Sequence, residues 1–386
     1  MTSDNRQTDA SDQSKRTDID SCFAIASAAP VEPAQAGQVR VAVLMSGGVD
    51  SSTTAFLLKK SGYDVVGVTG WLIKSGSRCC DTGMVDAARV AEQLGIGFHT
   101  VDLRELFKRE VVDQFHQAYA AGRTPLPCCL CNTAVKWGAL LEYSQQQLGA
   151  RYIATGHYAR LVNTPQGLAL ARAADRSKDQ SYVLWGLTRE QLASTLLPLG
   201  DLTKAEVRTI AKENNLVSAD RPDSQDLCFI PAGQTPQGYL AEFLPPKPGP
   251  IIDTVTGAVL GQHKGTHNYT IGQRRGLGLS APEPLYVTHI DSENDTIFVG
   301  PKETLLRSQL TASAVNWLTA EPPGKPFAAL VKIRYNCPTT AATIFPRKGG
   351  QVSIRFAERQ PAVTPGQVLG IYDSSDTFLL GGGWID

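Results

Sequence analysis

Short apolar runs alternate with helix-length amphipathic segments along the first half of the chain. The runs have the length of buried strands, and the segments between them repeat their apolar residues with the spacing of a helix. Strands are predicted at residues 41–45, 64–68 and 97–101, and helices at residues 52–61 and 84–94. Strand and helix in turn predict a parallel sheet covered by helices on both faces, which is an α/β fold.

The same alternation continues as far as residue 216. Helices are predicted within residues 103–122 and 133–149, and a strand with its exit loop at residues 151–161. Thr203 and Glu206 have the spacing of a capping box, which predicts the start of another helix.

Beyond about Gly233 the helical period disappears, and glycine and proline separate short apolar runs. Strand-length runs occur at residues 258–261, 285–290, 296–300, 329–335, 351–356 and 367–372. The last third is therefore predicted to be mostly β, with a small linking domain and a closed or sandwich-like terminal domain.

Length and charge bound the functions that remain. At 386 residues the chain is too long for one ordinary domain. We expect a disordered tail at residues 1–37 and domains at residues 38–232, 233–305 and 306–386. The 37 basic and 37 acidic side chains give no net charge, so a polyanionic partner would need a local basic patch. No apolar run approaches the roughly 20 residues of a membrane span, and we interpret the chain as cytoplasmic without a membrane partner.

Cysteine is the residue type with the most informative distribution. The chain has eight, namely Cys22, Cys79, Cys80, Cys128, Cys129, Cys131, Cys228 and Cys337. Without a secretion signal, thiols, metal ligands or redox groups are expected rather than structural disulfides. Cys128 and Cys131 have CxxC spacing, and together with Cys228 they could hold zinc or an iron–sulfur cluster.

The segment SGGVDSS, at residues 46–52, follows the first predicted strand. In an open parallel sheet, ligands bind at the carboxyl ends of the strands. The glycines let the backbone approach a phosphate, and the amides at a helix start favour an anion. Asp50 would repel a phosphate unless Mg²⁺ lies between them. The segment lacks the lysine of a Walker A loop. The alternative interpretation is a tight turn in which Asp50 or Ser51 caps the helix.

This segment resembles the pyrophosphate loop of the PP-loop ATPases, which cleave ATP between its α- and β-phosphates to adenylate a substrate. Further motifs follow in order: GRTPLPCCLCN (122–132), TGHYAR (155–160), KDQSYVL (178–184), SQDLCFI (224–230) and YTIGQRRGLG (269–278). With them the chain resembles the tRNA-specific 2-thiouridylases from about Arg40 to its C-terminus. The resemblance implies a Rossmann-like α/β parallel-sheet PP-loop domain of the adenine nucleotide α-hydrolase type, a small central domain and a C-terminal β-barrel.

The resemblance implies ATP-dependent 2-thiolation of the wobble uridine, U34, in the anticodon loop of tRNA. Replacing the C2 oxygen by sulfur needs a better leaving group, a sulfur nucleophile and a way to release that sulfur. Adenylation by ATP supplies the leaving group, and a cysteine persulfide supplies the sulfur. A second cysteine then attacks the persulfide and leaves a disulfide. By resemblance Cys131 is the nucleophile and Cys228 carries the persulfide, with a transient disulfide between them.

The resemblance also assigns binding residues. Those expected at ATP are Leu44, Met45, Ser46, Gly47, Gly48, Val49, Asp50, Ser51, Gly70 and Gly156, with Mg²⁺ held by Asp50 through the nucleotide. Those expected at tRNA are His157, Lys178, Asp179, Gln180, Arg334, Tyr335 and Gln367. Basic residues in QHKGTHNYTIGQRRG (262–276), among them Arg274 and Arg275, suit phosphate contacts. U34 would have to leave its stack, and an exposed aromatic ring could hold it.

Several alternatives stay open. Gly156 and His157 could simply end a strand, Ser177 and Gln180 have capping-box spacing, and the basic loop could be only solvated. Sulfur transfer could use a [4Fe-4S] cluster on Cys128, Cys131 and Cys228 in place of a persulfide. Leu126 departs from the asparagine that is common in the family, so base recognition by Leu126 and Cys128 is in doubt.

Two other functions are weighed against thiolation. Another PP-loop adenylating ligase or amidating synthetase would need an amine or a glutaminase partner, and none is visible. A binding protein for tRNA or metal that retains the fold is opposed by an intact SGGVDSS segment beside Cys131 and Cys228. We expect a monomer that receives sulfur from a donor or relay protein.

Overall fold

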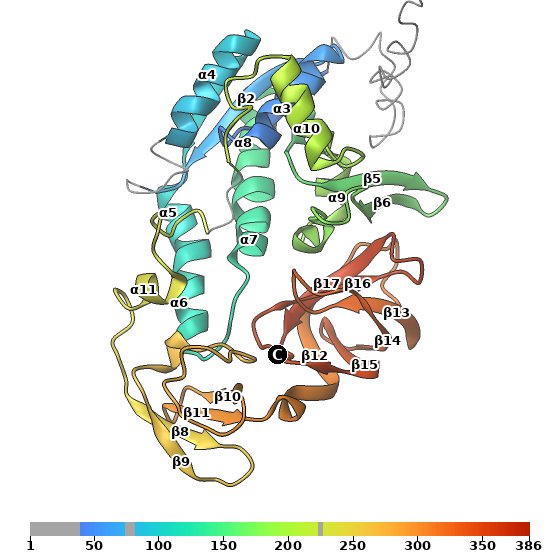
Figure 1. The fold of residues 1–386 in the computed structure, drawn as a ribbon. Coiled ribbons are helices and arrows are strands. Elements are labelled where there is room, and N and C mark those ends of the chain that lie inside the picture. Colours follow the sequence, from blue (N-terminus) through green and yellow to red (C-terminus); the bar gives the residue numbers. More distant parts are fainter. Residues whose placement is uncertain (1–38, 74–81, 223–226) are drawn as a thin grey trace, which may run out of the picture.

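The computed structural model describes residues 39–73, 82–222 and 227–386 (Figure 1). The predicted tail at residues 1–37 lies outside the described residues, as do Cys22, Cys79 and Cys80. Residues 224–226 of the SQDLCFI motif are also outside them.

The first part of the chain forms a five-stranded sheet in the order β3-β2-β1-β4-β7. Its strands are β1 (Arg40–Leu44), β2 (Asp64–Trp71), β3 (Gly97–Asp102), β4 (Tyr152–Ala154) and β7 (Thr195–Leu196). Every pairing between them is parallel, which confirms the predicted α/β fold.

Helices cover both faces of this sheet, and alternate residues of β1 show how. Val41 and Val43 pack in one core with α3 (Val49–Lys60) and α4 (Met84–Leu94). Ala42 and Leu44 point to the opposite core, which contains Trp137 and Leu140 of a long helix. Because both faces are covered, the strand is apolar from Val41 to Leu44, as buried parallel strands are.

Two long helices carry wide, π-type turns in their middle. The first runs through α5 (Arg104–Phe107), η2 (Lys108–Val112) and α6 (Asp113–Ala120). The second runs through α7 (Pro127–Leu130), η3 (Cys131–Leu140) and α8 (Leu141–Leu148). The sequence placed the start of the second helix at residue 133, which is too late, because Pro127 suits a first helical turn. Cys128 and Cys131 consequently lie on a helix and not in a loop.

A hairpin and short helices complete the α/β part. The hairpin pairs β5 (Ala159–Thr164) with β6 (Gly167–Arg172), so the single strand predicted at residues 151–161 is two strands in different sheets. η4 (Ser181–Leu184) and α9 (Arg189–Ala193) follow. α10 (Lys204–Glu213) begins at Thr203 with the predicted capping box to Glu206.

The central part is a four-stranded sheet preceded by the short helix α11 (Pro236–Leu240). Its order is β10-β11-β8-β9, where β8 and β11 are parallel and the other pairs are antiparallel. The elements are β8 (Gly249–Asp253), β9 (Val259–His263), η5 (Thr266–Asn268), β10 (Tyr286–Asp291), β11 (Thr296–Gly300) and η6 (Lys302–Leu305).

The C-terminal part is a closed six-stranded barrel, which decides between the closed and the sandwich-like alternatives. Its strands are β12 (Leu306–Trp317), β13 (Phe327–Lys332), β14 (Thr340–Arg347), β15 (Gln351–Pro361), β16 (Val368–Tyr372) and β17 (Leu379–Ile385). The sequence missed β17 because its glycines are typical of turns. A Cβ on Gly381 would lie 2.5 Å from the Asn316 carbonyl oxygen, so the close strand approach requires glycine there.

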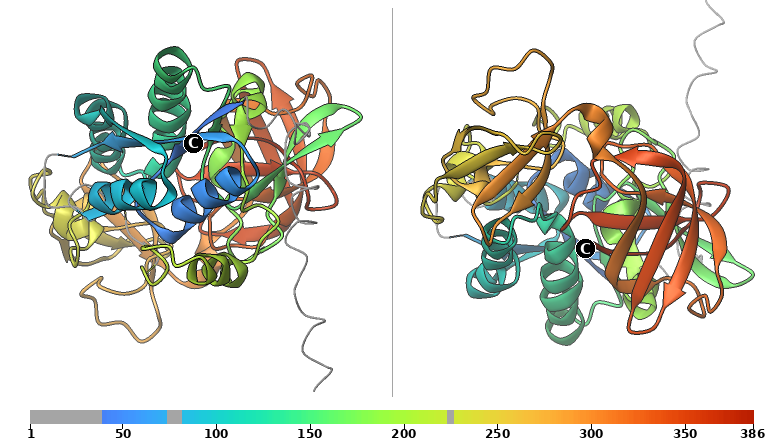
Figure 2. Two further views of the ribbon diagram at one scale, coloured as in Figure 1. Left: turned by 90° about the horizontal axis from the view of Figure 1, so that it is seen from above. Right: turned by 90° about the horizontal axis from the view of Figure 1, so that it is seen from below.

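The barrel packs directly on the α/β part (Figures 1 and 2). Val368 and Tyr372 of β16 share a hydrophobic core with Tyr182 of η4. Asn316 Nδ2 of β12 donates hydrogen bonds to the carbonyl oxygens of Trp185 (2.7 Å) and Leu187 (2.8 Å). Among the described residues, no helix has both the length and the apolar character that a membrane span requires.

Candidate active site

The loop Ser46–Gly48 joins β1 to α3. Gly48 is the N-cap of α3, and no side chain caps that helix, so the alternative of a cap by Asp50 or Ser51 is wrong. The helix also begins at Val49, three residues before the predicted start at Ser52. The amides of the first helical turn are therefore left without a capping side chain, as an anion site requires.

Internal hydrogen bonds fix the shape of this loop. Ser51 Oγ donates to the Gly48 carbonyl oxygen (3.1 Å) and accepts from the Ser46 amide (3.2 Å). Ser52 Oγ donates to the same carbonyl oxygen at 2.9 Å. Gly47 has φ +74°, and a Cβ there would lie 2.3 Å from the Gly83 carbonyl oxygen, so this position requires glycine.

The loop lies where the strand order reverses. β1 is flanked by β2 on one side and β4 on the other, so the carboxyl ends of β1 and β4 form the switch point of the sheet. Gly156, just beyond β4, meets α3 there, because a Cβ on Gly156 would lie 2.9 Å from Asp50 Cβ. Gly70 lies near the end of the adjacent β2. The structure thus brings together the residues predicted to bind ATP.

The residues predicted to bind ATP differ in whether a ligand can reach their side chains. Leu44 and Met45 are buried in the two cores of the sheet, so only their backbone is available to a ligand. Val49 is also buried, whereas the side chain of Asp50 is 33% exposed.

Asp50 is held by two residues that the sequence did not single out. Lys204 Nζ, from the first position of α10, donates to both carboxylate oxygens at 2.7 and 2.8 Å. Tyr158 Oη donates to Oδ1 at 2.8 Å. A carboxylate offers about four lone-pair positions, so these three bonds leave room for a shared cation. Two features of the sequence could have indicated these residues: Lys204 directly follows the predicted cap Thr203, and Tyr158 lies inside the motif TGHYAR.

Arg221 is a further cation at the loop. Its Nη1 donates to the Gly47 carbonyl oxygen at 3.0 Å and forms an ion pair with Asp86 of α4 at 2.7 Å. Arg221 thus connects α4 to the loop and adds positive charge at its edge, and no motif in the sequence pointed to it.

Cys131 and Cys228 pack against the same hydrophobic cluster although they lie far apart in the sequence. Cys131 opens the wide-turn segment η3, and Cys228 lies in the turn that closes with the bond from the Ile230 amide to the Leu227 carbonyl oxygen. Both half-buried cysteines pack against one hydrophobic cluster, which contains Phe107, Val111, Phe115, Tyr119, Val135, Phe229, Ile230, Tyr239 and Leu240. In the structure as described they are not joined by a disulfide. Wide helical turns are often found at functional sites.

The neighbouring cysteines have different environments. Cys129 is buried in the core under the sheet, and burial raises the pKa of its thiol far above the usual range, so it stays neutral. Cys128 is exposed on the same helix. Across the described ranges, no three His, Cys, Asp or Glu side chains gather closely enough to hold a metal ion.

His157 follows β4 and contacts the helix that carries Cys131. The Lys136 ammonium approaches Nε2 at 3.4 Å, and Nδ1 lies 2.8 Å from Thr155 Oγ1. Because an ammonium can only donate, the ring proton is assigned to Nδ1. Burial first and Lys136 second lower the pKa of His157 well below its usual range, so the ring is neutral. Lys136 comes from the helix that carries Cys131, and the sequence analysis missed it.

The segment Lys178–Gln180 is bonded largely inside the protein. Asp179 is buried and accepts hydrogen bonds from Arg172 Nε (2.8 Å) and the Ala173 amide (3.1 Å). Gln180 Oε1 accepts from the Tyr158 amide at 3.0 Å, which positions the tyrosine that contacts Asp50. The capping-box alternative at Ser177 is wrong, because the helix here starts at Ser181. A tRNA contact by this segment stays a prediction.

The barrel residues predicted to contact tRNA differ in their exposure and in their partners. Tyr335 is 40% exposed, and burial first, then the charges of Asp179 and Cys128, raise the pKa of its phenol. Arg334 Nη2 donates to the carbonyl oxygens of Pro361 and Ala362. Gln367 Nε2 donates to the Thr124 carbonyl oxygen at 2.8 Å, so it holds the loop that leads into α7.

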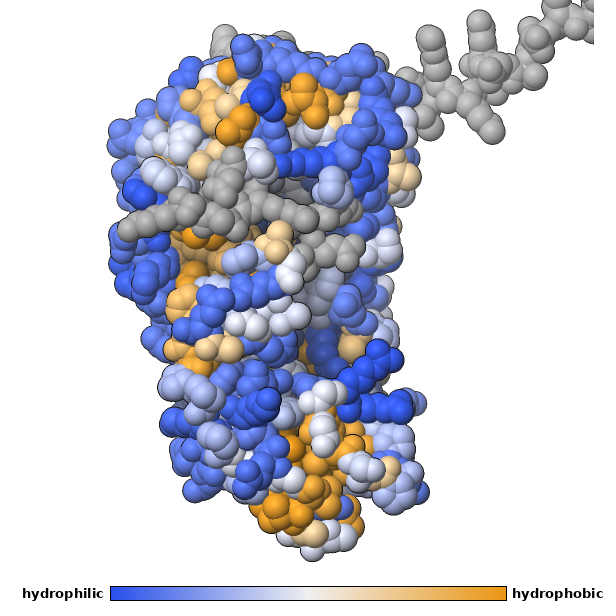
Figure 3. All heavy atoms as spheres, turned by 60° about the vertical axis from the view of Figure 1, so that its left-hand side comes forward, coloured by the Kyte–Doolittle hydropathy of each residue, from blue (hydrophilic) through white to orange (hydrophobic). Residues whose placement is uncertain are grey.

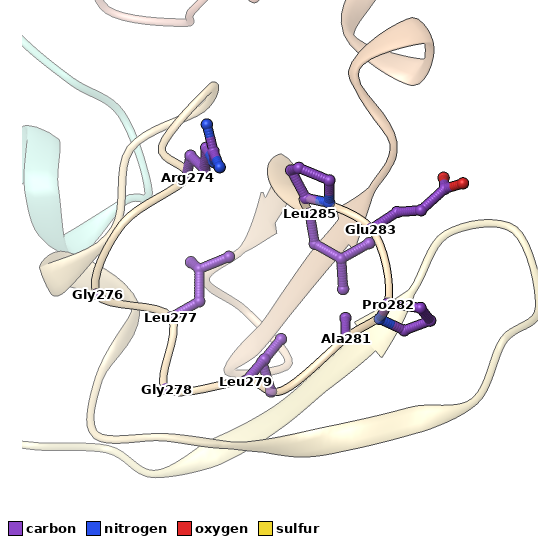
Figure 4. Close-up of a pocket in the computed structure, with 10 residues that line it drawn as sticks. Arg274, Gly276, Leu277, Gly278, Leu279, Ala281, Pro282, Glu283 and Leu285 are labelled. Carbon is purple, nitrogen blue, oxygen red and sulfur yellow. The ribbon is translucent and has the colours of Figure 1, made fainter.

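The basic segment at residues 262–276 is only partly available to RNA. His263, His267 and Tyr269 are buried, whereas Arg274 and Arg275 are exposed. Arg274 lies at the edge of a hollow of about 340 Å³ whose lining includes Leu277 and Leu285 (Figure 4). Figure 3 shows further apolar surface at this end of the molecule, where Val255, Val259 and Leu260 are exposed.

Comparison with known proteins assigns the family. The chain is 46% identical over 349 residues to the tRNA-specific 2-thiouridylase MnmA of Trichormus variabilis, covering 90% of this chain and 98% of that protein. It is 49% identical over 348 residues to the protein of the same name from Thermosynechococcus vestitus, covering 89% and 94%. The chain belongs to the tRNA-specific 2-thiouridylase family.

Family models match the three parts of this thiouridylase in turn. They are described as a tRNA methyl transferase HUP domain (39–232), a tRNA methyl transferase PRC-barrel domain (237–301) and an aminomethyltransferase β-barrel domain (307–385). A U34-tRNA thiolase, NcsA, from Methanococcus maripaludis, whose structure was solved with its [4Fe-4S] cluster, is 18% identical at a TM-score of 0.34. That match covers 49% of this chain and 60% of the other, which is too little similarity to bear on the chemistry.

Proposed function

We propose that this thiouridylase uses ATP to replace the C2 oxygen of the wobble uridine, U34, in tRNA by sulfur. One observation carries the proposal: Cys131 and Cys228, from distant segments, pack against one cluster in a protein whose phosphate-type loop lies at the switch point of the sheet. A PP-loop ligase or amidating synthetase has no use for such a cysteine pair.

ATP supplies the leaving group. The uridine C2 oxygen attacks the α-phosphate, pyrophosphate leaves, and the base becomes an O-adenylated intermediate. The first-turn amides of α3, with Gly47 and Gly48, would hold the phosphates, and Asp50 would hold Mg²⁺ that neutralises them. Lys204 and Tyr158 hold the carboxylate in place before the nucleotide binds, and Gly156 leaves space for Asp50.

The cysteine pair supplies the sulfur. A donor protein loads Cys228 as a persulfide, and the Cys131 thiolate attacks the inner sulfur of that persulfide. A Cys131–Cys228 disulfide forms and hydrosulfide leaves, attacks C2 and expels AMP. A thiol reductant then returns the disulfide to two thiols, which balances the electrons. Packing against the same cluster supports this pairing, because the two Cα atoms must approach within about 7 Å.

The RNA is expected to lie across the barrel and the central sheet. We propose contacts by Arg334, Tyr335, Arg274 and Arg275, with His157 near the target base. Domain boundaries at residues 38–232, 233–305 and 306–386 and a monomeric enzyme complete this proposal.

A [4Fe-4S] cluster is the alternative carrier of sulfur. It would need Cys128, Cys131 and Cys228 as ligands, and among the described residues these do not form a three-ligand group. We propose the persulfide as the sulfur carrier, and the cluster stays the alternative that the cysteine variants test.

Mass analysis of tRNA nucleosides tests the proposal. Incubation with enzyme, ATP, Mg²⁺ and a sulfur donor should give 2-thiouridine at position 34 and one AMP per thiouridine. Omission of ATP or of the donor should give none. Methylated uridine formed with S-adenosylmethionine, and no thiouridine with ATP, would contradict the proposal.

A further inference from the structure

Lys332 is a buried lysine without a bonded partner. Its residue is only 7% exposed, yet across the described part of the chain it forms no ion pair or hydrogen bond. Its ammonium nitrogen is not fully enclosed. The nitrogen therefore reaches solvent, while the carbon chain of the side chain is buried. Lysine is almost never buried in this way unless it is paired.

The strand geometry directs this side chain toward the α/β part. In β13, Ala329 and Val331 point into the barrel core, so by alternation Leu330 and Lys332 point outward. The outward side is covered by the α/β part, since Leu330 packs in the core that contains Tyr182. Lys332 Nζ lies 5.8 Å from the ring centre of Tyr182 and 5.9 Å from that of Tyr335.

The two carboxylates near Lys332, Asp179 and Asp376, each pair with Arg172. Arg172 donates to Asp179 at 2.8 Å and also pairs with Asp376. The oxygens of Asp179 accept further bonds from Ala173 and Ser181. Burial first and then Arg172 lower the pKa of Lys332, because nothing bonded to the ammonium compensates its charge.

We propose that Lys332 is an anion-binding residue of the RNA site, where its ammonium binds a backbone phosphate of the strand whose base stacks on Tyr335. The inference rests on the proposed function, because it needs tRNA as the ligand. A phosphate restores the missing partner, and the ring of Tyr335, 40% exposed, offers a stacking face next to it.

Binding of an anticodon stem-loop RNA to the full-length enzyme, measured by fluorescence anisotropy at several salt concentrations, tests this proposal. Lys332→Met should raise Kd about tenfold, since a charge-assisted bond is lost. It should also reduce the slope of log K against log salt by about 0.7–0.9. Lys332→Arg should retain most of the affinity. Lys348→Met, which removes an exposed lysine of the same barrel, should change neither quantity.

Two competing explanations predict other results. Asp376 Oδ1 also lacks a partner, so Lys332 could serve only to balance that carboxylate. Unchanged RNA affinity with a lowered melting temperature in Lys332→Met would support that role and overturn the proposal. A raised KM for ATP with unchanged RNA affinity in Lys332→Met would mean that the ammonium binds the nucleotide, and it would overturn the proposal. An equal loss of RNA affinity in Lys348→Met would mean that any barrel lysine contributes, which would also overturn it.

The binding measurement needs no turnover. Failure of the wild-type enzyme to thiolate tRNA would refute the proposed function, whereas wild-type thiolation with unchanged RNA binding by Lys332→Met would refute only this inference.

Discussion

The phosphate-type loop and the cysteine pair are built in opposite ways. The loop is one continuous segment whose serines bond to its own backbone, so its shape is largely local. The cysteine pair is assembled from a helix start and a distant turn, and it is held by a shared aromatic and aliphatic cluster. Local hydrogen bonds make the first region rigid, whereas the second depends on tertiary packing.

This difference suits the two half-reactions. Adenylation needs donors fixed in advance around the phosphates, because preorganised dipoles lower the barrier most. Disulfide exchange needs two sulfurs to change partners, and the cysteines come from separate segments that share a hydrophobic cluster. Substitutions should therefore separate AMP formation from thiolation.

The largest effect is expected at the cysteines. Cys228→Ser should abolish persulfide loading, and Cys131→Ser should still load sulfur but not release it. Thiolation should fall by more than about a thousandfold in each, as expected when a reacting group is removed. Persulfide labelling and nucleoside mass analysis measure the two steps, and Cys337→Ser, a half-buried cysteine of the barrel, is the control.

A different result at the cysteines would change the mechanism. If Cys128→Ser fails together with both variants and a visible iron chromophore is lost, sulfur is carried by a cluster. Full thiolation by either single variant without iron would reject both mechanisms.

Asp50→Asn should impair adenylation and leave sulfur loading intact. It removes the charge expected to hold Mg²⁺, so AMP formation should fall about 10²–10³-fold while persulfide loading on Cys228 continues. Asp64→Asn, at an exposed ion pair with Arg40, is the matched control. Normal AMP formation by Asp50→Asn would exclude this carboxylate from the reaction.

Gly156→Ala tests the close contact between β4 and α3. The new Cβ would lie 2.9 Å from Asp50 Cβ and 3.0 Å from the Ser51 amide, so the loop must shift. AMP formation should fall about tenfold or more, because small displacements of positioned groups are costly. Gly324→Ala, where the added Cβ meets open space, should have no effect. Equal activity in both variants would show that the loop tolerates displacement.

The smallest effect is expected on stability, at the interface between the barrel and the α/β part. Asp376→Asn removes one of the two carboxylates that pair with Arg172, and the free energy of unfolding should fall by about 1–2 kcal/mol, since Asp376 is partly exposed. Denaturant titration measures it, with Asp64→Asn expected to cost less than about 1 kcal/mol. An equal loss of unfolding free energy in both variants would mean that the Arg172–Asp376 pair does not stabilise this interface.

The same contrast explains how much could be predicted from the sequence. The parallel sheet, the loop at Ser46 and the capping box at Thr203 depend on local patterns, and the structure confirms the sheet and the cap. β17 was missed because its glycines serve close strand packing, which a local pattern cannot distinguish from turns.

Long-range partners were beyond such patterns. Lys204, Tyr158 and Arg221 reach the loop from segments far along the chain. The burial of Asp179 depends on Arg172, which also joins it to the barrel. The residues next to Asp179 in the sequence do not indicate that its carboxylate is buried.

The central claim is that ATP activates the C2 oxygen of U34 before sulfur replaces it. The most direct test uses tRNA in which that oxygen carries a heavy isotope, with mass analysis of the AMP released in one turnover. The account predicts that the label appears in the phosphate of AMP, in proportion to the 2-thiouridine formed. Thiolation with unlabelled AMP would show that the C2 oxygen is never adenylated and would contradict it.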